Sequence, residues 1–270
     1  MARFGKRFGL GWGDVSSFNP KKIPGLGLDL DASYGVLNSI NPDVPATNGQ
    51  AVRRWLDKSG NGRDFDQSTA TNQPIFESAG MNGRACIDCD GVNDFMERIN
   101  DSLLQNVPGA TVFHVIINDS VSPTNLSNIF AISRNANFSR YVTFQNTVGA
   151  RYSLLVRRTD EGVSGQIDST VSSATTNPTI LTSLADFPSA TGAIYIDGVL
   201  NTAGATANPG ALTSNTASIL LRLAANPASP PTIFYGGKIA RVLVWPRALT
   251  APEIAQVHAY LSQTYGIPLA

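Results

Sequence analysis

Short apolar runs separated by turn residues recur along the chain from Leu26 onward. Such runs, bounded by Gly, Pro, Asn, Asp or Ser, are typical of strands in an all-β sandwich. An Asp197-Gly198 pair between apolar flanks adds a strong hairpin signal. We interpret the Ser-, Thr-, Ala- and Asn-rich stretches 169–178 and 201–218 as surface connections. The pattern predicts strands at Ala85–Cys89, Thr111–Ile117, Asn128–Ser133, Tyr141–Gln145, Ser153–Arg158, Thr179–Leu184, Gly192–Ile196, Ser218–Leu223 and Gly237–Trp245.

One helix is predicted near the C-terminus, in "ALTAPEIAQVHAYLSQTYG". Thr250 and Glu253 have the spacing of a capping box, and Gly266 provides a stop signal. The intervening apolar positions share one helical stripe, so the helix is expected to cover a face or an edge of the sandwich. The stripe consists of Ile254, Val257, His258, Leu261 and Tyr265.

The first 25 residues differ from the rest of the chain. They mix Gly, aromatic and basic residues without periodicity, which is typical either of a disordered terminus or of a segment that orders on a neighbouring subunit. We therefore divide the chain into an extended arm at 1–25 and one sandwich domain at 26–270. The arm residues suited to assembly are Arg3, Phe4, Lys6, Arg7, Phe8 and Trp12.

Composition narrows the class of protein. Twenty basic and twenty acidic side chains cancel, so no global field is expected to draw the chain to nucleic acid or to a membrane. The N-terminus lacks the apolar core of a signal peptide, and no apolar run reaches the length of a membrane helix. We therefore expect the protein to be made in a cytoplasm without a signal peptide, and to be kept there or released by lysis. Two cysteines exclude a disulfide framework.

The stretch "VRRWLDKSGNGRDFDQ", residues 52–67, concentrates turn and acidic residues. It lacks the Lys-Ser/Thr pair of a phosphate-binding loop, and Ser68 stands where a helix–loop–helix calcium site requires Glu. A looser calcium site that uses Asp57, Asp64 and backbone carbonyls stays open as the only cofactor expectation.

The alternative interpretation of the same stretch is an architectural corner. In it, Trp55 anchors the corner in the core, while Asp57 and Ser59 bind backbone N–H groups. Gly60 and Gly62 then supply the positive φ angles that two tight turns require.

Candidate catalytic groups are sparse. Retaining glycosidases use two carboxylates about 5 Å apart, which neighbouring positions on one strand face can provide. None of the four glutamates lies two or four residues from another, so glycoside hydrolysis is not expected. These glutamates are Glu77, Glu97, Glu161 and Glu253.

The histidines, cysteines and large aromatics are expected to be structural. His114 and His258 have no Gly-x-Ser-x-Gly elbow beside them. Cys86 and Cys89 form a C-x-x-C without further zinc ligands, and an i,i+3 pair on a strand points to opposite faces. We also expect most aromatics to lie in the core rather than to stack on sugars. Those weighed as sugar platforms are Trp12, Trp55, Trp245, Tyr141, Tyr152 and Tyr195.

The order of "RRWLDKSGNGRDFDQ", "QPIFES" and "NGRACIDCDGVNDFME" resembles laminin-G-like domains of the concanavalin A-like lectin/glucanase superfamily. "GLGLDLDAS" and "GKIARVLVWPRALTAPEIAQVHAYLSQTYGI" resemble the family's opening motif and its closing strand and helix, so the likeness covers about residues 26–268. Two departures stand out, because Asp29 replaces a Trp and Cys89 replaces a Phe. The structural motif comprises Trp55, Asp57, Ser59, Gly60, Asn61, Gly62, Asp90, Gly91 and Asp94.

The resemblance implies a jelly-roll β-sandwich of two antiparallel sheets but is nearly silent on ligand. Similar chains look common among bacteriophage virion proteins. We therefore expect a non-enzymatic virion structural accessory, a capsid-decoration or fibre-type subunit, whose arm docks on a major capsid, tail or fibre protein. It is expected to form a homo-oligomer on the particle and to adhere to host glycans. A carbohydrate-binding module or a polysaccharide-cleaving enzyme is the alternative.

Overall fold

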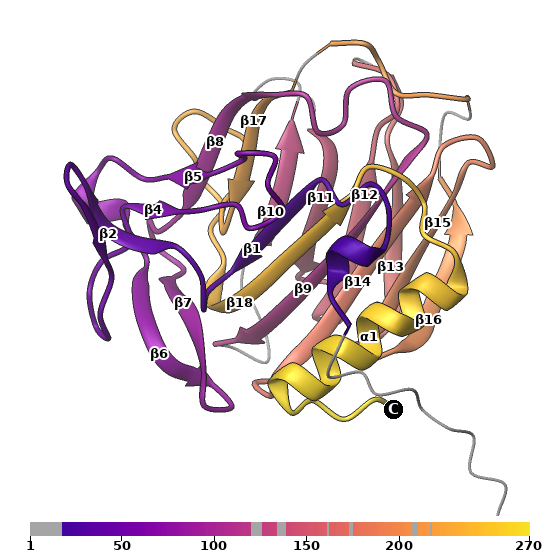
Figure 1. Cartoon of the computed structure of the whole chain (residues 1–270). Coiled ribbons are helices and arrows are strands. Elements are labelled where there is room, and N and C mark those ends of the chain that lie inside the picture. The colour runs from indigo at the N-terminus through magenta and orange to yellow at the C-terminus, as the bar shows by residue number, and fades with distance from the viewer. Residues whose placement is uncertain are drawn as a thin grey trace, which may run out of the picture.

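The computed structural model describes residues 18–119, 126–133, 139–160, 162–172, 175–206, 210–216 and 218–270. These residues form two antiparallel sheets that face each other, with one helix on the outside (Figure 1). The predicted all-β sandwich with one C-terminal helix is therefore confirmed. Most of the predicted arm lies outside the described residues, and its boundary at residue 25 stays a prediction.

The first layer is an eight-stranded sheet, in which β1 pairs with β18 beside the main strand order. Its strands, in sheet order, are β16 (Val199–Ala205), β15 (Thr191–Ile196), β14 (Thr179–Asp186), β9 (Gly109–Asn118), β18 (Gly236–Trp245), β7 (Arg84–Asp90) and β6 (Ile75–Met81), with β1 (Leu28–Asp31) on β18.

The second layer is a ten-stranded sheet. Its strands, in sheet order, are β13 (Gly165–Ser172), β12 (Arg151–Val156), β11 (Ser139–Asn146), β10 (Ser127–Ser133), β17 (Ser218–Leu223), β8 (Met96–Asp101), β5 (Phe65–Asp66), β4 (Arg54–Trp55), β2 (Val36–Ile40) and β3 (Asp43–Pro45). Two short 3-10 helices, η2 (Pro20–Lys22) and η3 (Ala70–Asn72), complete the described secondary structure with α1 (Ala251–Tyr265).

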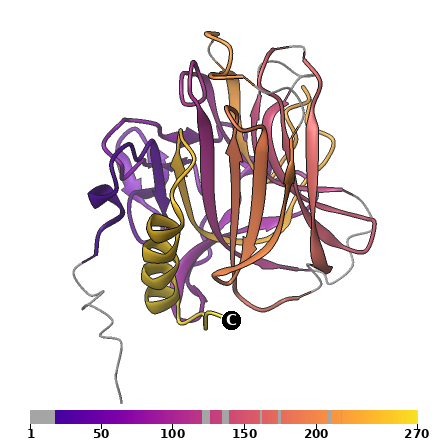
Figure 2. The same ribbon diagram turned by 90° about the vertical axis from the view of Figure 1, so that its right-hand side faces the viewer.

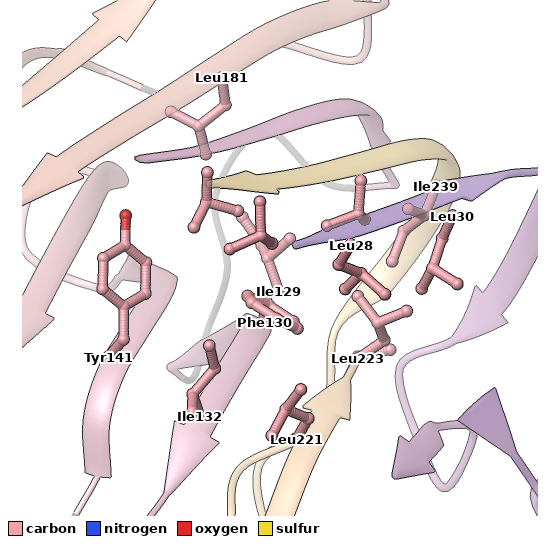
Figure 3. Close-up of a cluster of buried hydrophobic side chains, with 14 of the residues drawn as sticks. Leu28, Leu30, Ile129, Phe130, Ile132, Tyr141, Leu181, Leu221, Leu223 and Ile239 are labelled. Atoms are coloured by element: carbon pink, nitrogen blue, oxygen red, sulfur yellow. The ribbon is translucent and has the colours of Figure 1, made fainter. Parts of the chain in front are cut away.

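The main core lies between the two sheets, where apolar side chains of both layers meet (Figure 3). Leu28, Leu30 and Ile239 come from the eight-stranded sheet, and Leu221 and Leu223 come from the ten-stranded sheet. Each is fully buried, and burying one such side chain contributes about 1.5–3 kcal/mol. This shared core fixes the two sheets as one unit.

Helix α1 lies against the outer face of the eight-stranded sheet (Figure 2). A second core lies between this helix and the sheet. The predicted apolar stripe of the helix is buried there, which confirms the helix and its orientation. The Glu253 carboxylate accepts the Thr250 backbone N–H at 2.8 Å, and Gly266 ends the helix with φ 63°. One face of the sandwich is thus covered by the helix.

The predicted strands are confirmed, each within a few residues of its expected ends. Asp197 and Gly198 form the β15–β16 turn with φ 47° and 85°, as the hairpin signal predicts. The interpretation of 169–178 and 201–218 as surface connections is wrong in part. Their first residues belong to edge strands β13 and β16, whose small and polar side chains gave no apolar alternation.

Candidate functional site

The Asp-rich corner is built from hydrogen bonds. Asp57 Oδ1 accepts the backbone N–H groups of Asp29 and Ser59, at 3.0 and 2.9 Å. Its Oδ2 accepts the Arg63 N–H and the Ser59 hydroxyl, at 3.0 and 2.7 Å. Asp64 in turn accepts the Asp57 N–H at 2.9 Å. The Asp57 carboxylate thereby ties β1 to the loop between β4 and β5.

These hydrogen bonds occupy the oxygen atoms that the predicted calcium site would use. A metal ion at Asp57 would have to displace donors that already use both carboxylate oxygens. In the ranges that the structure describes, no group of three or more His, Cys, Asp or Glu is placed to hold a metal ion. The calcium site at Asp57 and Asp64 stays a prediction.

The rest of the sequence motif also makes backbone contacts. Gly60 and Gly62 have φ angles of 96° and 66°, and the Asn61 amide donates to the Leu26 and Gly27 carbonyls at 3.0 and 3.1 Å. Trp55 is fully buried in the main core.

The second part of the motif is the turn after β7. Asp90 Oδ1 accepts the N–H groups of Val92, Asn93 and Asp94, while Asp94 Oδ2 accepts the Asp90 N–H. Gly91 has φ 72° and packs against Gly236. Burial raises the pKa of Asp94 to about 6.

The histidines and cysteines are buried structural groups. His114 points into the main core against Phe130, and burial lowers its pKa to about 3. His258 is a buried residue of α1, and its Nε2 lies 2.8 Å from the Thr182 hydroxyl. Cys86 belongs to the core under α1 and Cys89 to the core between the sheets, so the two thiols lie on opposite faces of β7.

The aromatics weighed as sugar platforms do not form one among the described residues. Trp55, Trp245, Tyr141 and Tyr152 are buried, and Tyr195 packs against the core under α1. Trp12 lies outside the described residues. Tyr141 reaches across the main core, where its hydroxyl donates to the Ser183 carbonyl of β14 at 2.8 Å.

The orientation of Tyr141 shows which side chains of β11 face outward. Successive residues of a strand alternate between faces, so Val142 and Phe144 point away from the core. Val142 pairs with Ala131 of β10 and with Leu155 of β12, and Phe144 pairs with Asn128 of β10. An apolar cluster therefore lies on the outer face of the ten-stranded sheet.

A groove with a volume of about 220 Å³ opens over this cluster, and we take it as the candidate site. Val142, Phe144 and Leu155 form an apolar floor, while Asn128 and Arg157 supply the polar atoms. The Arg157 Nε donates to the Gly162 carbonyl at 2.6 Å, which holds the guanidinium at the rim. The described lining is Leu126, Asn128, Val142, Phe144, Leu155, Arg157 and Ile233.

A second groove, of about 260 Å³, lies on the same sheet at β5 and β8 and includes Asp64. Its carboxylates are engaged: Asp66 binds Arg53 and Arg54, and Glu97 binds Arg222. It is lined by Arg53, Asp64, Asp66, Ser68, Glu97, Arg98 and Ile99.

Sequence reasoning located the strands of the first groove but not its residues. Asn128 and Phe144 lie in runs that were recognised as strands, yet their outward orientation depends on which residues the opposite sheet covers. The alternation in "SRYVTFQN" separates the two faces without saying which one is inside.

Family comparison agrees with this architecture. A family model described as the concanavalin A-like lectin/glucanases superfamily matches residues 117–255, just over half of the chain. The chain belongs to this superfamily. The opening corner and the Asp90 turn precede the matched range. No curated protein matches the sequence.

Solved structures with the same fold have little sequence in common with the chain. The Trypanosoma rangeli sialidase in complex with sialic acid is 14% identical with TM-score 0.58, over 89% of this chain and 33% of the sialidase. The botulinum neurotoxin serotype G binding domain is 14% identical with TM-score 0.61, over 88% of this chain and 51% of that structure's chain. The chain thus spans a third of the first and half of the second.

Another similar structure is a single domain of comparable size. It is domain 4 of AbnA, an extracellular GH43 arabinanase from Geobacillus stearothermophilus, in complex with arabinotriose. Identity is 14% and the TM-score is 0.54, over 86% of this chain and 98% of that domain. At these identities the likenesses establish the fold. The described residues also contain no helix long and apolar enough to span a membrane.

Proposed function

We propose that the chain is a non-enzymatic glycan-binding sandwich carried on a bacteriophage particle as a capsid-decoration or fibre-type subunit. Its N-terminal arm attaches to the virion, and the groove on the ten-stranded sheet faces outward to bind host glycans. The partners are other virion subunits, such as a major capsid, tail or fibre protein, and further copies of the same chain.

One observation carries this proposal: the described end of the arm, at Phe18, and the groove lie on opposite faces of the sandwich. Phe18 packs against Tyr260 of α1, with ring centroids 5.5 Å apart, and α1 covers the outer face of the eight-stranded sheet. The groove lies on the outer face of the other sheet, with the main core between them. An arm bound to a particle would therefore leave the groove accessible.

The lining of the groove supports sugar binding. A sugar ring presents apolar C–H faces and polar hydroxyls, and small-molecule sites combine an apolar lining with a few oriented polar groups. The apolar lining is formed by Val142, Phe144 and Leu155. The polar groups belong to Asn128 and Arg157. No Asp, Glu or His stands among the described lining residues, which supports binding without acid–base catalysis.

Removal of residues 1–17 tests the attachment. The truncated protein keeps Phe18 and is expected to fold but to be absent from particles purified from cells that express it. A variant with Arg3, Lys6 and Arg7 changed to Ala keeps the length of the arm but removes three of its positive charges. A variant with the arm sequence reversed is the matched control, because it keeps both the length and the composition. Full incorporation of the truncated protein would refute attachment through the arm.

A glycan array tests the binding face. Leu155 is half-buried in the groove, so Leu155→Arg is expected to fill the groove and abolish binding. Val171→Arg is the control, because Val171 is 49% exposed on the neighbouring strand β13. Binding that survives Leu155→Arg would exclude the groove, and release of reducing ends from a bound glycan would contradict the absence of catalysis.

A further inference from the structure

We propose that the groove on the ten-stranded sheet binds the acylamino group of an N-acylated amino sugar at the end of a glycan. The inference rests on the proposed glycan binding and names the chemical group that the groove selects. Its starting point is one side chain, Asn128, at the beginning of β10.

Asn128 is 93% buried, because only 7% of its surface is exposed, and that surface opens on the groove. Among the described residues, no hydrogen bond reaches its side-chain amide, and the part of this amide that is not enclosed by the protein faces the groove. Nearly all buried polar side chains in folded proteins have a partner. An amide held in an apolar wall without one is therefore poised for a partner that is not part of the fold.

The chemistry of the amide restricts that partner. The Asn side chain presents an N–H donor and a carbonyl acceptor side by side, so a ligand with an adjacent acceptor and donor satisfies both. An acylamino group has this arrangement, since its carbonyl accepts and its N–H donates. A pair of sugar hydroxyls satisfies the same atoms but carries no methyl group.

The apolar floor of the groove can bind the methyl group of an acetylamino substituent. Phe144 pairs with Asn128, and Val142 of the same strand pairs with Leu155 of β12 on the same face of the sheet. Leu126 and Ile233 complete the apolar wall. An acetyl methyl placed there leaves water and gains about four-fold in affinity, the equivalent of one buried methyl-sized group. Hydroxyl-bearing sugars without the acyl group gain nothing from this surface.

The size of the groove indicates that it binds a single sugar residue at the end of a glycan. Pockets for drug-sized ligands have volumes of about 300–1,000 Å³. At about 220 Å³ the groove is smaller, so one ring with its substituent fills it and an extended chain does not. The groove is therefore expected to read the terminal residue of a glycan.

The experiment titrates the full-length protein with monosaccharide pairs, followed by ligand-observed NMR and calorimetry. N-acetylglucosamine and N-acetylgalactosamine are compared with glucose and galactose. The N-acetylated member of each pair is expected to bind at least about five-fold more tightly, because it alone supplies both the amide partner and the methyl group. Glucuronate is included to probe the alternative that Arg157 selects a carboxylate.

Two nearly isosteric variants test the roles of the residues. Asn128→Asp replaces the donor by an acceptor and is expected to abolish the preference for the N-acetyl sugar. Val142→Thr replaces a methyl by a hydroxyl and is expected to weaken N-acetyl binding about four-fold while parent sugars are unaffected. Val171→Thr on β13 is the control, and the melting temperature of each variant reports its folding.

The outcomes separate this inference from the proposed function. Equal binding of N-acetylated and parent sugars, or preference for glucuronate, would overturn the inference and leave glycan binding intact. Absence of binding to every glycan on the array and to all five monosaccharides would overturn both. Retention of the N-acetyl preference by Asn128→Asp would assign the preference to another site and refute the role of Asn128.

Discussion

Arg241 of β18 donates two hydrogen bonds to the Asp29 carboxylate of β1, with Nε 3.0 Å from Oδ1 and Nη2 2.9 Å from Oδ2. Both side chains are almost wholly buried, and Asp31 lies 3.0 Å from the third guanidinium nitrogen. Burial alone would lower the pKa of Arg241, but the two carboxylates raise it above its ordinary value. Burial raises the pKa of Asp29, and Arg241 opposes that rise, while Arg241 itself remains charged inside the fold.

Asp29→Asn is expected to destabilise the protein by about 3 kcal/mol, because it removes one partner of a buried ion pair and leaves the guanidinium with Asp31 alone. Thermal unfolding should then begin roughly 6–12 °C lower. Arg53→Ala is the control, since its pair with Asp66 is partly exposed and is worth less than about 1 kcal/mol. Similar losses in the two variants would contradict a special role for the buried pair.

This pair also marks a limit of sequence reasoning. The sequence identifies Asp29 as a departure from the family's usual Trp, but its partner lies 212 residues away. Nothing local to "GLGLDLDAS" signals an arginine on the closing strand. Long-range pairing of polar side chains is a property of the folded sheet and leaves no periodic trace.

The fold itself was largely predictable. Strands with apolar alternation, the Asp197-Gly198 turn and the capped helix each follow from local chemistry. The sequence pattern did not predict β1 to β6, β8, β13 or β16. Strands β1 to β5 are five residues long or shorter, and β13 and β16 are edge strands of small and polar residues. The groove was missed for another reason, because its outward face is defined only once the eight-stranded sheet covers the other face of the ten-stranded sheet.

Asp57→Ala is expected to destabilise the protein by about 3 kcal/mol, since it leaves the backbone N–H groups of Asp29, Ser59 and Arg63 without their acceptor. Chemical denaturation with and without calcium or a chelator measures the effect. Calcium is expected to leave the unaltered protein unchanged, because both carboxylate oxygens already accept hydrogen bonds. A calcium-dependent gain in stability that Asp57→Ala removes would instead establish the predicted metal site.

Acid is expected to weaken the fold through its buried histidines. Burial lowers the pKa of His258 to about 4 and that of His114 to about 3. As the pH falls below about 6.5, the unfolded chain binds protons that the folded chain does not, so each histidine lowers the free energy of unfolding by up to about 1.4 kcal/mol per pH unit. Urea denaturation between pH 7 and pH 4.5 measures this slope.

Two variants separate the groups that titrate in this range. His258→Gln should flatten the slope, because one proton-binding difference is removed. Asp94 has the opposite effect on the free energy of unfolding as the pH falls. Burial raises its pKa to about 6, so the folded chain binds this proton at a higher pH than the unfolded chain does. Asp94→Asn should therefore steepen the acid loss between pH 6 and pH 4. A slope that neither variant changes would assign the acid sensitivity to other groups.

The C-x-x-C cysteines are expected to be unreactive in the folded protein. Burial raises the pKa of Cys86 to about 12 and that of Cys89 well above its ordinary value, so neither thiol forms appreciable thiolate near neutral pH. Ellman's reagent should label both thiols only in denaturant. Rapid labelling of the native protein, or a disulfide between the two, would contradict their positions on opposite faces of β7.

The position of a truncation near residue 18 should decide whether the sandwich keeps its stability. Ile23 is buried under α1, and its carbonyl accepts the Trp245 indole N–H at 3.2 Å. Removal of residues 1–25 is expected to lose about 3 kcal/mol, from one buried Ile side chain and one buried hydrogen bond. Removal of residues 1–17 retains both contacts and should unfold like the intact chain in a urea titration. Equal stability of the two truncated proteins would show that residues 18–25 belong to the arm rather than to the domain.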